Sequence, residues 1–370
     1  MTATAEDPVR RKGGPDLRTR LARLAAKPGF QLWAARIPGV RGHVRQEGAA
    51  LFDLVQGFVA SQVLRAVVEL EILHHAMEGP LVASELSRRI NVPLGRTEIL
   101  LQAAAALGLL DRKRDTFRIT TRGAALTGVP GLEGMIRHHD AFYRDMSDPV
   151  ALLRGEVDTE LARFWPYVFG GAGGDAASAR YYSTLMSDSQ ALVAEDTLAT
   201  VSLKGQKRLL DIGGGHGAFA RAVRERRSKL EIGVFDLPEV IADAPQSDGI
   251  EFIAGSFRSD PLPEGFDTMS LVRVLYDHED ATVRDLLAKA FDALPPGGQL
   301  LVSEPMSGGQ RPDRHGDVYF AFYTMAMQTG RARSAERIIT LLTEAGFAGI
   351  TAHRPIRPYV TAVVTAWKPA

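Results

Sequence analysis

An apolar segment near the middle of the chain runs directly into four glycines, which fall within the five residues from Gly213 to Gly217. Glycines at the point where a strand turns into a helix let the backbone approach a ligand closely and leave the N-terminus of the helix facing it. The turn by itself does not choose the ligand, because Gly213, Gly215 and Ala218 also satisfy a relaxed dinucleotide fingerprint. Two interpretations are open at this point: a cofactor site, or a turn that only packs a helix on a strand.

The second half of the chain alternates between strand-like and helix-like segments, which predicts an open α/β sheet. Strands are expected at residues 208–212, 231–236, 250–254, 268–275, 299–304, 349–353 and 359–367. Helices are expected between them, including 279–293 and 334–345. We therefore predict a Rossmann-like, seven-stranded α/β domain over residues 171–370.

The preceding part, residues 47–170, is expected to be mainly helical. Apolar residues recur at helical spacing and predict one long helix over 49–73. A helix–turn–helix follows at 83–107, and a small β-wing at 109–120 completes a winged-helix pattern. The second helix of this motif is rich in Ala and Leu and offers little to base edges. We expect it to serve dimerisation or to cover a substrate, and we expect no nucleic-acid partner.

The composition excludes several classes of function and site. Lys plus Arg and Asp plus Glu both total 44, so no net charge draws the chain to nucleic acid, and the absence of cysteine excludes disulfides and thiolate metal sites. No metal site is expected. We also expect no apolar run to approach the length of a membrane span, because polar and charged residues interrupt the segment from Leu51 to Leu73. Without an apolar signal region at the N-terminus, the expected location is the cytoplasm.

Residues 1–46 form a basic arm, in which ten Lys and Arg side chains face three acidic ones, an excess of seven positive charges. Apolar residues, including Phe30 and Trp33, are interleaved with the charges. Two interpretations stay open: a solvated, partly disordered arm, or a segment that rests peripherally on a membrane surface.

Three features around the glycine turn point to one cofactor. Asp211 directly precedes the glycines, Asp236 ends the second strand and is followed by Leu237 and Pro238, and the sheet closes with a predicted strand pair. Together they resemble the S-adenosylmethionine-dependent O-methyltransferases that act on small molecules in plants and bacteria. The resemblance covers nearly everything after the basic arm. It implies a winged-helix dimerisation domain before the catalytic domain, a homodimer, and S-adenosylmethionine as cofactor.

Carried over residue by residue, the resemblance implies the cofactor site. Gly213 and Gly215 would bend around the methionine part, Asp236 would hold the ribose, Phe257 would pack on adenine, and Arg273 would contact the cofactor. The full implied set is Asp211, Gly213, Gly215, Asp236, Leu237, Ser256, Phe257, Arg273 and Tyr182. Ser256 stands where the family usually has Asp and is a weaker polar substitute.

The catalytic position departs from the family pattern. Members that methylate phenols have His-Asp-Trp at the end of the fourth strand, and that His is the general base. Here the segment reads Tyr276-Asp277-His278, so a tyrosine occupies the base position and a histidine the adenine-stacking position. Glu304 matches the Glu that orients the family's His, but Ala332 replaces a second expected Glu.

We therefore expect Tyr276 to position a substrate hydroxyl while His278, His139 or His138 accepts its proton. Each of these histidines could instead be an ordinary hydrogen-bonded core or surface residue. Candidate residues for an apolar substrate pocket, which could equally be core, are Phe142, Tyr182, Met186, Phe320, Tyr323, Met325 and Met327.

Longer phrases match one branch of the family. The runs Leu51-Phe52-Asp53-Leu54-Val55 and Arg273-Val274-Leu275-Tyr276-Asp277-His278 resemble family members of purple photosynthetic bacteria that methylate carotenoids. The resemblance implies transfer of a methyl group to the tertiary 1-hydroxyl of an acyclic hydroxycarotenoid. The alternatives are methylation of a polyketide or another pigment and, in a different class, a winged-helix regulator whose α/β domain senses the cofactor.

Overall fold

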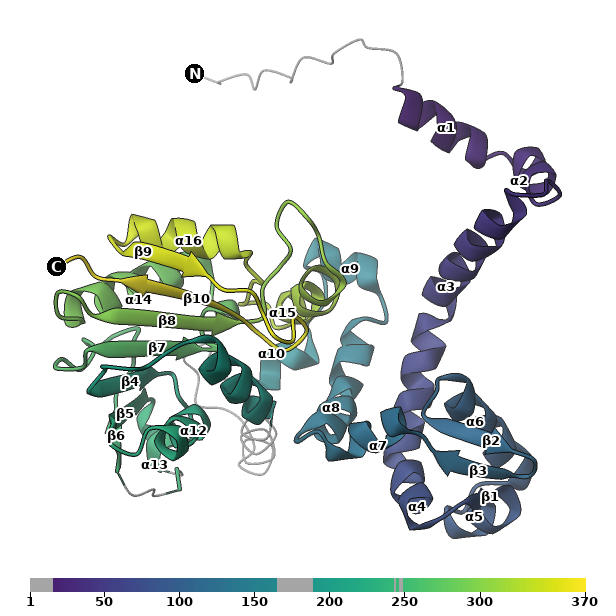
Figure 1. The fold of residues 1–370 in the computed structure, drawn as a ribbon, viewed down its shortest axis with the longest axis horizontal. Coiled ribbons are helices and arrows are strands. Elements are labelled where there is room, and N and C mark those ends of the chain that lie inside the picture. Colours follow the sequence, from purple (N-terminus) through teal and green to yellow (C-terminus); the bar gives the residue numbers. More distant parts are fainter. Residues whose placement is uncertain (1–15, 165–188, 243, 246–248) are drawn as a thin grey trace.

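The computed structural model describes residues 16–164, 189–242, 244–245 and 249–370. Tyr182 and Met186, expected to touch cofactor and substrate, lie outside the described residues. Figure 1 shows two parts: a sheet flanked by helices, formed by the second half of the chain, and a helical part that precedes it.

The sheet has seven strands in the order β6-β5-β4-β7-β8-β10-β9, which confirms the predicted number. The strands are β4 (Arg208–Ile212), β5 (Glu231–Asp236), β6 (Ile250–Ala254), β7 (Thr268–Val272), β8 (Gln299–Glu304), β9 (Ala348–Ala352) and β10 (Ala362–Trp367). The first five pair in parallel, whereas β10 runs antiparallel to both β8 and β9. The predicted strand 268–275 was too long, because the chain leaves β7 at Val272 and forms a short 3-10 turn, Leu275–Asp277.

Helices cover both faces of this sheet, because successive strand residues point to opposite sides. Leu210 packs in one apolar cluster with residues of α14 and α16, and its neighbour Leu209 packs in another with residues of α12. The helices of this part include α12 (Ala218–Arg226), α13 (Pro238–Ala242), α14 (Asp280–Ala293), the π-helix η3 (His315–Phe320), α15 (Ala321–Ala326) and α16 (Ala335–Glu344), and residues 189–200 are helical as well. Because helices cover both faces, β4, β7 and β8 are buried at every position except Arg208, and this includes polar residues such as Asp211, Ser270 and Glu304.

The N-terminal part contains the predicted helix–turn–helix and wing. Its elements are α1 (Leu17–Ala25), α2 (Pro28–Ala34), α3 (Arg41–Glu69), α4 (Ile72–Glu78), β1 (Leu81–Val82), α5 (Ala83–Arg89), α6 (Leu94–Ala106), β2 (Leu110–Lys113) and β3 (Thr116–Ile119). The three strands form a small sheet in the order β1-β3-β2. The predicted bounds of the long helix, 49–73, were wrong at both ends. The helix α3 begins at Arg41, and Glu71, whose φ is 51°, separates it from α4.

The long helix α3 also corrects the expectation about membrane spans. By length and composition alone, Arg41–Glu69 is apolar enough to cross a membrane, because its charged residues lie far enough apart to leave an apolar window. Most of this window is exposed in the single chain. The exposed apolar residues of α3 are Leu51, Phe52, Leu54, Val55, Phe58 and Val59. Such a surface equally suits a helix that packs against another protein chain.

Four further helices lead from the winged helix to the sheet: α7 (Thr121–Gly128), α8 (Leu132–Asp145), α9 (Pro149–Arg154) and α10 (Glu160–Phe164). They meet the second part at α15, where Ala141 and Leu161 share an apolar cluster with Tyr323 and Met327. Figure 1 shows α8 and α10 beside α15. This packing brings side chains of α8 to the carboxyl edge of the sheet, where ligands bind in open α/β folds.

Candidate active site

The glycine turn joins β4 to α12, and its backbone explains its composition. Gly213, Gly215 and Gly217 have φ of 66°, 57° and 79°, a conformation that side chains disfavour. A Cβ atom on Gly213 would lie 2.9 Å from the Cγ2 atom of Val274, so the turn packs closely against the chain that leaves β7. A Cβ atom on Gly215 would meet nothing within 4 Å, which leaves this side of the turn open to a ligand.

Asp236 braces the same turn from the neighbouring strand. One carboxylate oxygen accepts the backbone N–H of Gly215 at 2.7 Å, and the other accepts that of Leu237, also at 2.7 Å. Burial raises the pKa of Asp236, and the two backbone N–H groups oppose this shift. The carboxylate is therefore fixed in place at the end of β5, as a ligand for vicinal hydroxyls must be.

Asp211 contributes a second carboxylate beneath the turn. Its Oδ1 atom accepts the hydroxyl of Ser270 at 2.6 Å, while its Oδ2 atom has no hydrogen-bond partner among the described residues. Burial raises the pKa of Asp211 to about 7, and the nearby charge of Asp236 adds to the effect. An unpaired, buried acceptor beside an open glycine turn fits a ligand that carries positive charge.

His278 packs beside Phe257 and Arg258 of the loop after β6. Its ring meets that of Phe257 edge-on, with centroids 5.3 Å apart, and its Nδ1 atom lies 3.2 Å from Nη2 of Arg258. Burial lowers the pKa of His278 to about 4, aided by the charges of Arg258 and Arg333. These contacts place His278 beside Phe257, the residue expected to pack on adenine, and its expected role as a proton acceptor stays a prediction.

Ser256 belongs to the loop after β6 and holds it in shape. Its backbone N–H donates to Oδ2 of Asp260 at 2.8 Å, and its hydroxyl accepts the backbone N–H of Arg258 at 3.3 Å. Both contacts stabilise the loop that carries Phe257.

Arg273 follows β7 with φ of 58°, a conformation that few residues other than glycine adopt. Its backbone N–H donates to the carbonyl of Ser303 at 2.8 Å, and its side chain donates to Ser189 at 3.0 Å. The guanidinium lies 5.8 Å from the ring centroid of Tyr276. Arg273 thus directly precedes Val274, which packs on the glycine turn, and its guanidinium lies near the ring of Tyr276.

Glu304, which matches the Glu that orients the family's His, contacts backbone groups in this chain. It accepts the backbone N–H groups of Val274, Leu275 and Tyr276 at 3.1, 2.7 and 3.0 Å. Burial raises the pKa of Glu304 to about 7, against these hydrogen bonds. The carboxyl group therefore holds the 3-10 turn that presents Tyr276.

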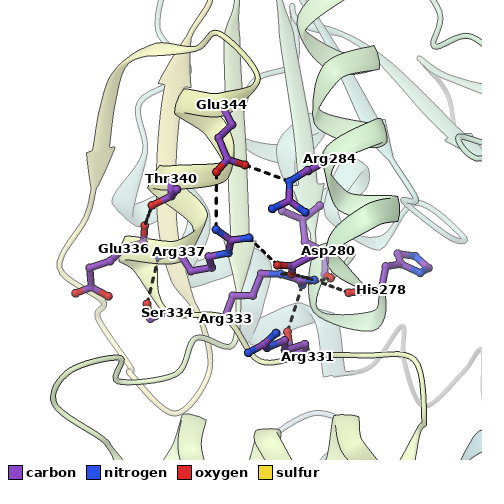
Figure 2. Close-up of polar contacts among 11 residues, drawn as sticks. His278, Asp280, Arg284, Arg331, Arg333, Ser334, Glu336, Arg337, Thr340 and Glu344 are labelled. Atoms are coloured by element: carbon purple, nitrogen blue, oxygen red, sulfur yellow. Dashed lines mark hydrogen bonds and ion pairs between the residues drawn. The ribbon is translucent and has the colours of Figure 1, made fainter. Parts of the chain in front are cut away.

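Arg333 holds the opposite side of that turn (Figure 2). Its guanidinium donates to the carbonyl oxygens of Leu275 and His278, both at 2.7 Å, and pairs with Asp280 at 2.8 Å. Asp280 also pairs with Arg337 of α16 at 2.7 Å. Because Glu304 takes the N–H groups and Arg333 the carbonyl groups, the Tyr276 turn is fixed from both sides.

Two histidines of α8 reach two tyrosines of the π-helix and α15. His138 lies 2.9 Å from the hydroxyl of Tyr323, and His139 lies 2.7 Å from that of Tyr319. Phe142 meets the rings of both tyrosines edge-on. Tyr319 was not among the predicted site residues. Its spacing of four residues from Tyr323 could have indicated it, because residues four apart on a helix lie on the same face.

The expected substrate pocket is only partly assembled by the described residues. Phe142 is half-buried beside Tyr319 and Tyr323, whereas Met327 is fully buried in the cluster beneath them. Met327 therefore packs the core rather than lining an open pocket. Among the described residues there is no group of three or more His, Asp or Glu side chains that could hold a metal ion.

Comparisons with known proteins match this geometry. Residues 143–348 match the O-methyltransferase domain, and residues 52–128 match the O-methyltransferase dimerisation domain. The chain belongs to the O-methyltransferase family. The dimerisation domain supports a homodimer, and it includes most of the exposed apolar surface of α3.

Individual family members agree. The demethylspheroidene O-methyltransferase of Cereibacter sphaeroides is 50% identical, with 97% of each chain covered. That of Rhodobacter capsulatus is 51% identical over 90% of this chain and 85% of its own. The structure of human N-acetylserotonin methyltransferase in complex with S-adenosylmethionine superposes with a TM-score of 0.76 at 25% identity, covering 88% of this chain and 98% of that one. The cofactor of this O-methyltransferase is S-adenosylmethionine.

Proposed function

We propose that this O-methyltransferase transfers a methyl group from S-adenosylmethionine to the tertiary 1-hydroxyl of an acyclic hydroxycarotenoid, in the carotenoid biosynthesis of a photosynthetic bacterium. The observation that carries the proposal is 50% identity over 97% of both chains to a demethylspheroidene O-methyltransferase. The tyrosine at position 276 supports it, because an enzyme for aliphatic alcohols does not need the base that ionises a phenol.

The residues around the glycine turn would hold the cofactor, which when bound supplies an electrophilic methyl group on a sulfonium. Asp236 would take the ribose hydroxyls, Gly215 would leave room for the methionine part, and Asp211 would face its positive charge. Phe257 and His278 would flank the adenine.

The main task of the protein would then be to hold the substrate hydroxyl in line with the methyl group. An aliphatic hydroxyl is too weak an acid to be ionised before attack, so its proton leaves during or after attack. Burial raises the pKa of Tyr276, so its phenol stays protonated and can orient the substrate hydroxyl without acting as a base. Holding two reactants in line contributes up to about 7–11 kcal/mol in ideal cases.

Incubation with labelled S-adenosylmethionine and a panel of hydroxycarotenoids and phenols tests the proposal. We expect label in the carotenoids alone. Label in phenolic pigments or polyketides, with none in any hydroxycarotenoid, would contradict the proposed substrate and favour the alternative enzyme.

We further propose that the basic arm rests on the anionic surface of the photosynthetic membrane, with the enzyme otherwise in the cytoplasm. Leu17, Leu21 and Leu24 form one exposed apolar face of α1, and Arg18, Arg20 and Arg23 flank it. In α2, Leu32 and Trp33 are exposed as well. Figure 1 shows both helices at the end of α3 that points away from the winged helix. An apolar face bordered by cations is typical of helices that lie in the membrane interface.

Vesicle sedimentation tests the arm. We expect salt-sensitive binding to anionic phosphatidylglycerol vesicles, because each cation near such a surface contributes about 1 kcal/mol and salt screens it. Deleting residues 1–40 should weaken binding and slow turnover of membrane-embedded substrate, with unchanged affinity for S-adenosylhomocysteine. Equal sedimentation of the truncated and full chains would show that the arm is a solvated tail or covers another protein surface.

A further inference from the structure

The two histidine–tyrosine pairs between α8 and the segment 315–326 are built alike but lie in different surroundings. His138 and Tyr323 are 6% and 5% exposed, so their hydrogen bond is closed off in the core. His139 and Tyr319 are only half-buried, and their hydrogen bond is the shorter one at 2.7 Å. The outer pair is therefore the one that a ligand can reach.

Arg273, at the end of β7, lies near the tyrosines of both pairs. The charge of Arg273 acts on the phenols of Tyr276, Tyr319 and Tyr323, and it lowers the pKa of each against the larger rise that burial causes. Arg273 precedes Val274, which packs on Gly213 of the glycine turn. The three tyrosines thus gather around one residue beside the glycine turn, and of the two histidine–tyrosine pairs only the outer one is open to a ligand there.

The protonation states suit a relay. Burial raises the pKa of Tyr319, so it stays a neutral phenol, which can donate to Nε2 of His139 in the tautomer that carries its proton on Nδ1. Burial, together with the charge of His138, lowers the pKa of His139 to about 4, so its ring is neutral at pH 7 and, in that tautomer, offers the lone pair of Nε2 to Tyr319. Tyr143 of the same helix and the charge of Arg273 also face Tyr319. A phenol that donates to a neutral imidazole can take one proton while it gives up another.

We propose that Tyr319 and His139 form the proton relay that replaces the missing histidine base of the family. This rests on the proposed methylation of an aliphatic alcohol. The hydroxyl oxygen of the substrate forms the new C–O bond as the S–C bond breaks, and the sulfur keeps that electron pair. The protonated ether then passes its proton to Oη of Tyr319 while Tyr319 gives its own to Nε2 of His139. The imidazolium of His139 later releases the proton to water.

A weak base is sufficient for this step. A protonated dialkyl ether is a far stronger acid than any side chain, so an imidazole with a pKa of about 4 still accepts its proton. A phenol-methylating enzyme needs a stronger base, because its substrate must lose the proton earlier.

Matched tyrosine variants test the relay. We expect Tyr319→Phe to lower kcat on a hydroxycarotenoid by about 10²-fold, the lower range for general acid–base groups, with KM and the affinity for S-adenosylhomocysteine unchanged. Tyr323→Phe removes a phenol with a similar hydrogen bond one helical turn away. Its kcat should fall by about tenfold at most. Equal losses in the two variants, or wild-type kcat in Tyr319→Phe, would overturn the proposal.

Chemical rescue distinguishes a proton acceptor from a packing residue. In His139→Gly, added imidazole should restore at least about a tenth of the wild-type kcat, whereas Tyr319→Phe should gain nothing from it. Absence of rescue in a His139→Gly protein that still binds S-adenosylhomocysteine would overturn the relay. A wild-type enzyme that methylates no hydroxycarotenoid would instead contradict the proposed function on which the relay rests.

Discussion

The carboxylate of Glu304 accepts the backbone N–H of Tyr276 at 3.0 Å, and so a residue of β8 fixes the turn at the end of β7. In family members with histidine at the position of Tyr276, the matching Glu is expected to orient the side chain of that histidine. Here it serves the backbone of three successive residues. The turn keeps its shape although the side chain at its centre has changed.

Removing this acceptor should destabilise the protein strongly. Glu304→Ala leaves three buried N–H groups without a partner, each costing about 1–3 kcal/mol, so we expect the free energy of unfolding to fall by about 3 kcal/mol or more. As a control, Glu344→Ala removes an exposed carboxylate of α16 that pairs with Arg284 of α14. It should lower the free energy of unfolding by less than about 1 kcal/mol. Urea unfolding followed by circular dichroism measures both, and equal losses would show that the turn does not depend on Glu304.

Asp236→Ala should abolish cofactor binding while the protein stays folded. The variant loses the fixed carboxylate proposed to hold the ribose and releases the N–H of Gly215. We expect the affinity for S-adenosylhomocysteine to fall at least about 100-fold in calorimetry, equivalent to two charge-assisted hydrogen bonds. The exposed Asp292 on α14 supplies the control, Asp292→Ala, with native affinity expected. Near-native affinity in Asp236→Ala would rule out this site.

Asp211 should make the stability of the free enzyme depend on pH. Its pKa is raised by burial to about 7 in the folded chain, so the folded state holds the proton more tightly than the unfolded state. Its contribution to stability is therefore complete below about pH 4 and is lost as pH rises through about 7. Asp211→Asn, which mimics the protonated form, should show a smaller decline in the free energy of unfolding between pH 4 and 8. Identical slopes for variant and wild type would contradict the raised pKa.

The apolar surface of α3 should hold the homodimer together. Phe58 is 72% exposed in the single chain, and Phe58→Glu would place a charge in the middle of that surface. We expect light scattering at micromolar concentration to give a dimer for the wild type and a monomer for Phe58→Glu. Ile356→Glu, at an apolar residue 54% exposed in the sheet domain, should remain a dimer. A wild-type monomer, or a dimeric Phe58→Glu, would place the interface elsewhere.

The sequence alone determined the parts of the protein that depend on neighbours along the chain. Strand and helix periodicity located the sheet, and the glycines after Asp211 marked the turn, because only a few residues set each of these patterns. The position of Asp236 at the end of the next strand followed from the same order of elements.

Only the tertiary structure decided what the side chains of the candidate site contact. His139 and Tyr319 are 180 positions apart, and they meet because α8 packs against α15, which no local pattern encodes. Packing likewise turned Glu304 toward backbone groups and His278 toward Phe257. A residue's type and place in a motif fix which hydrogen bonds it is able to make. Which of them it makes depends on the partners that the folded chain brings within about 3 Å of it.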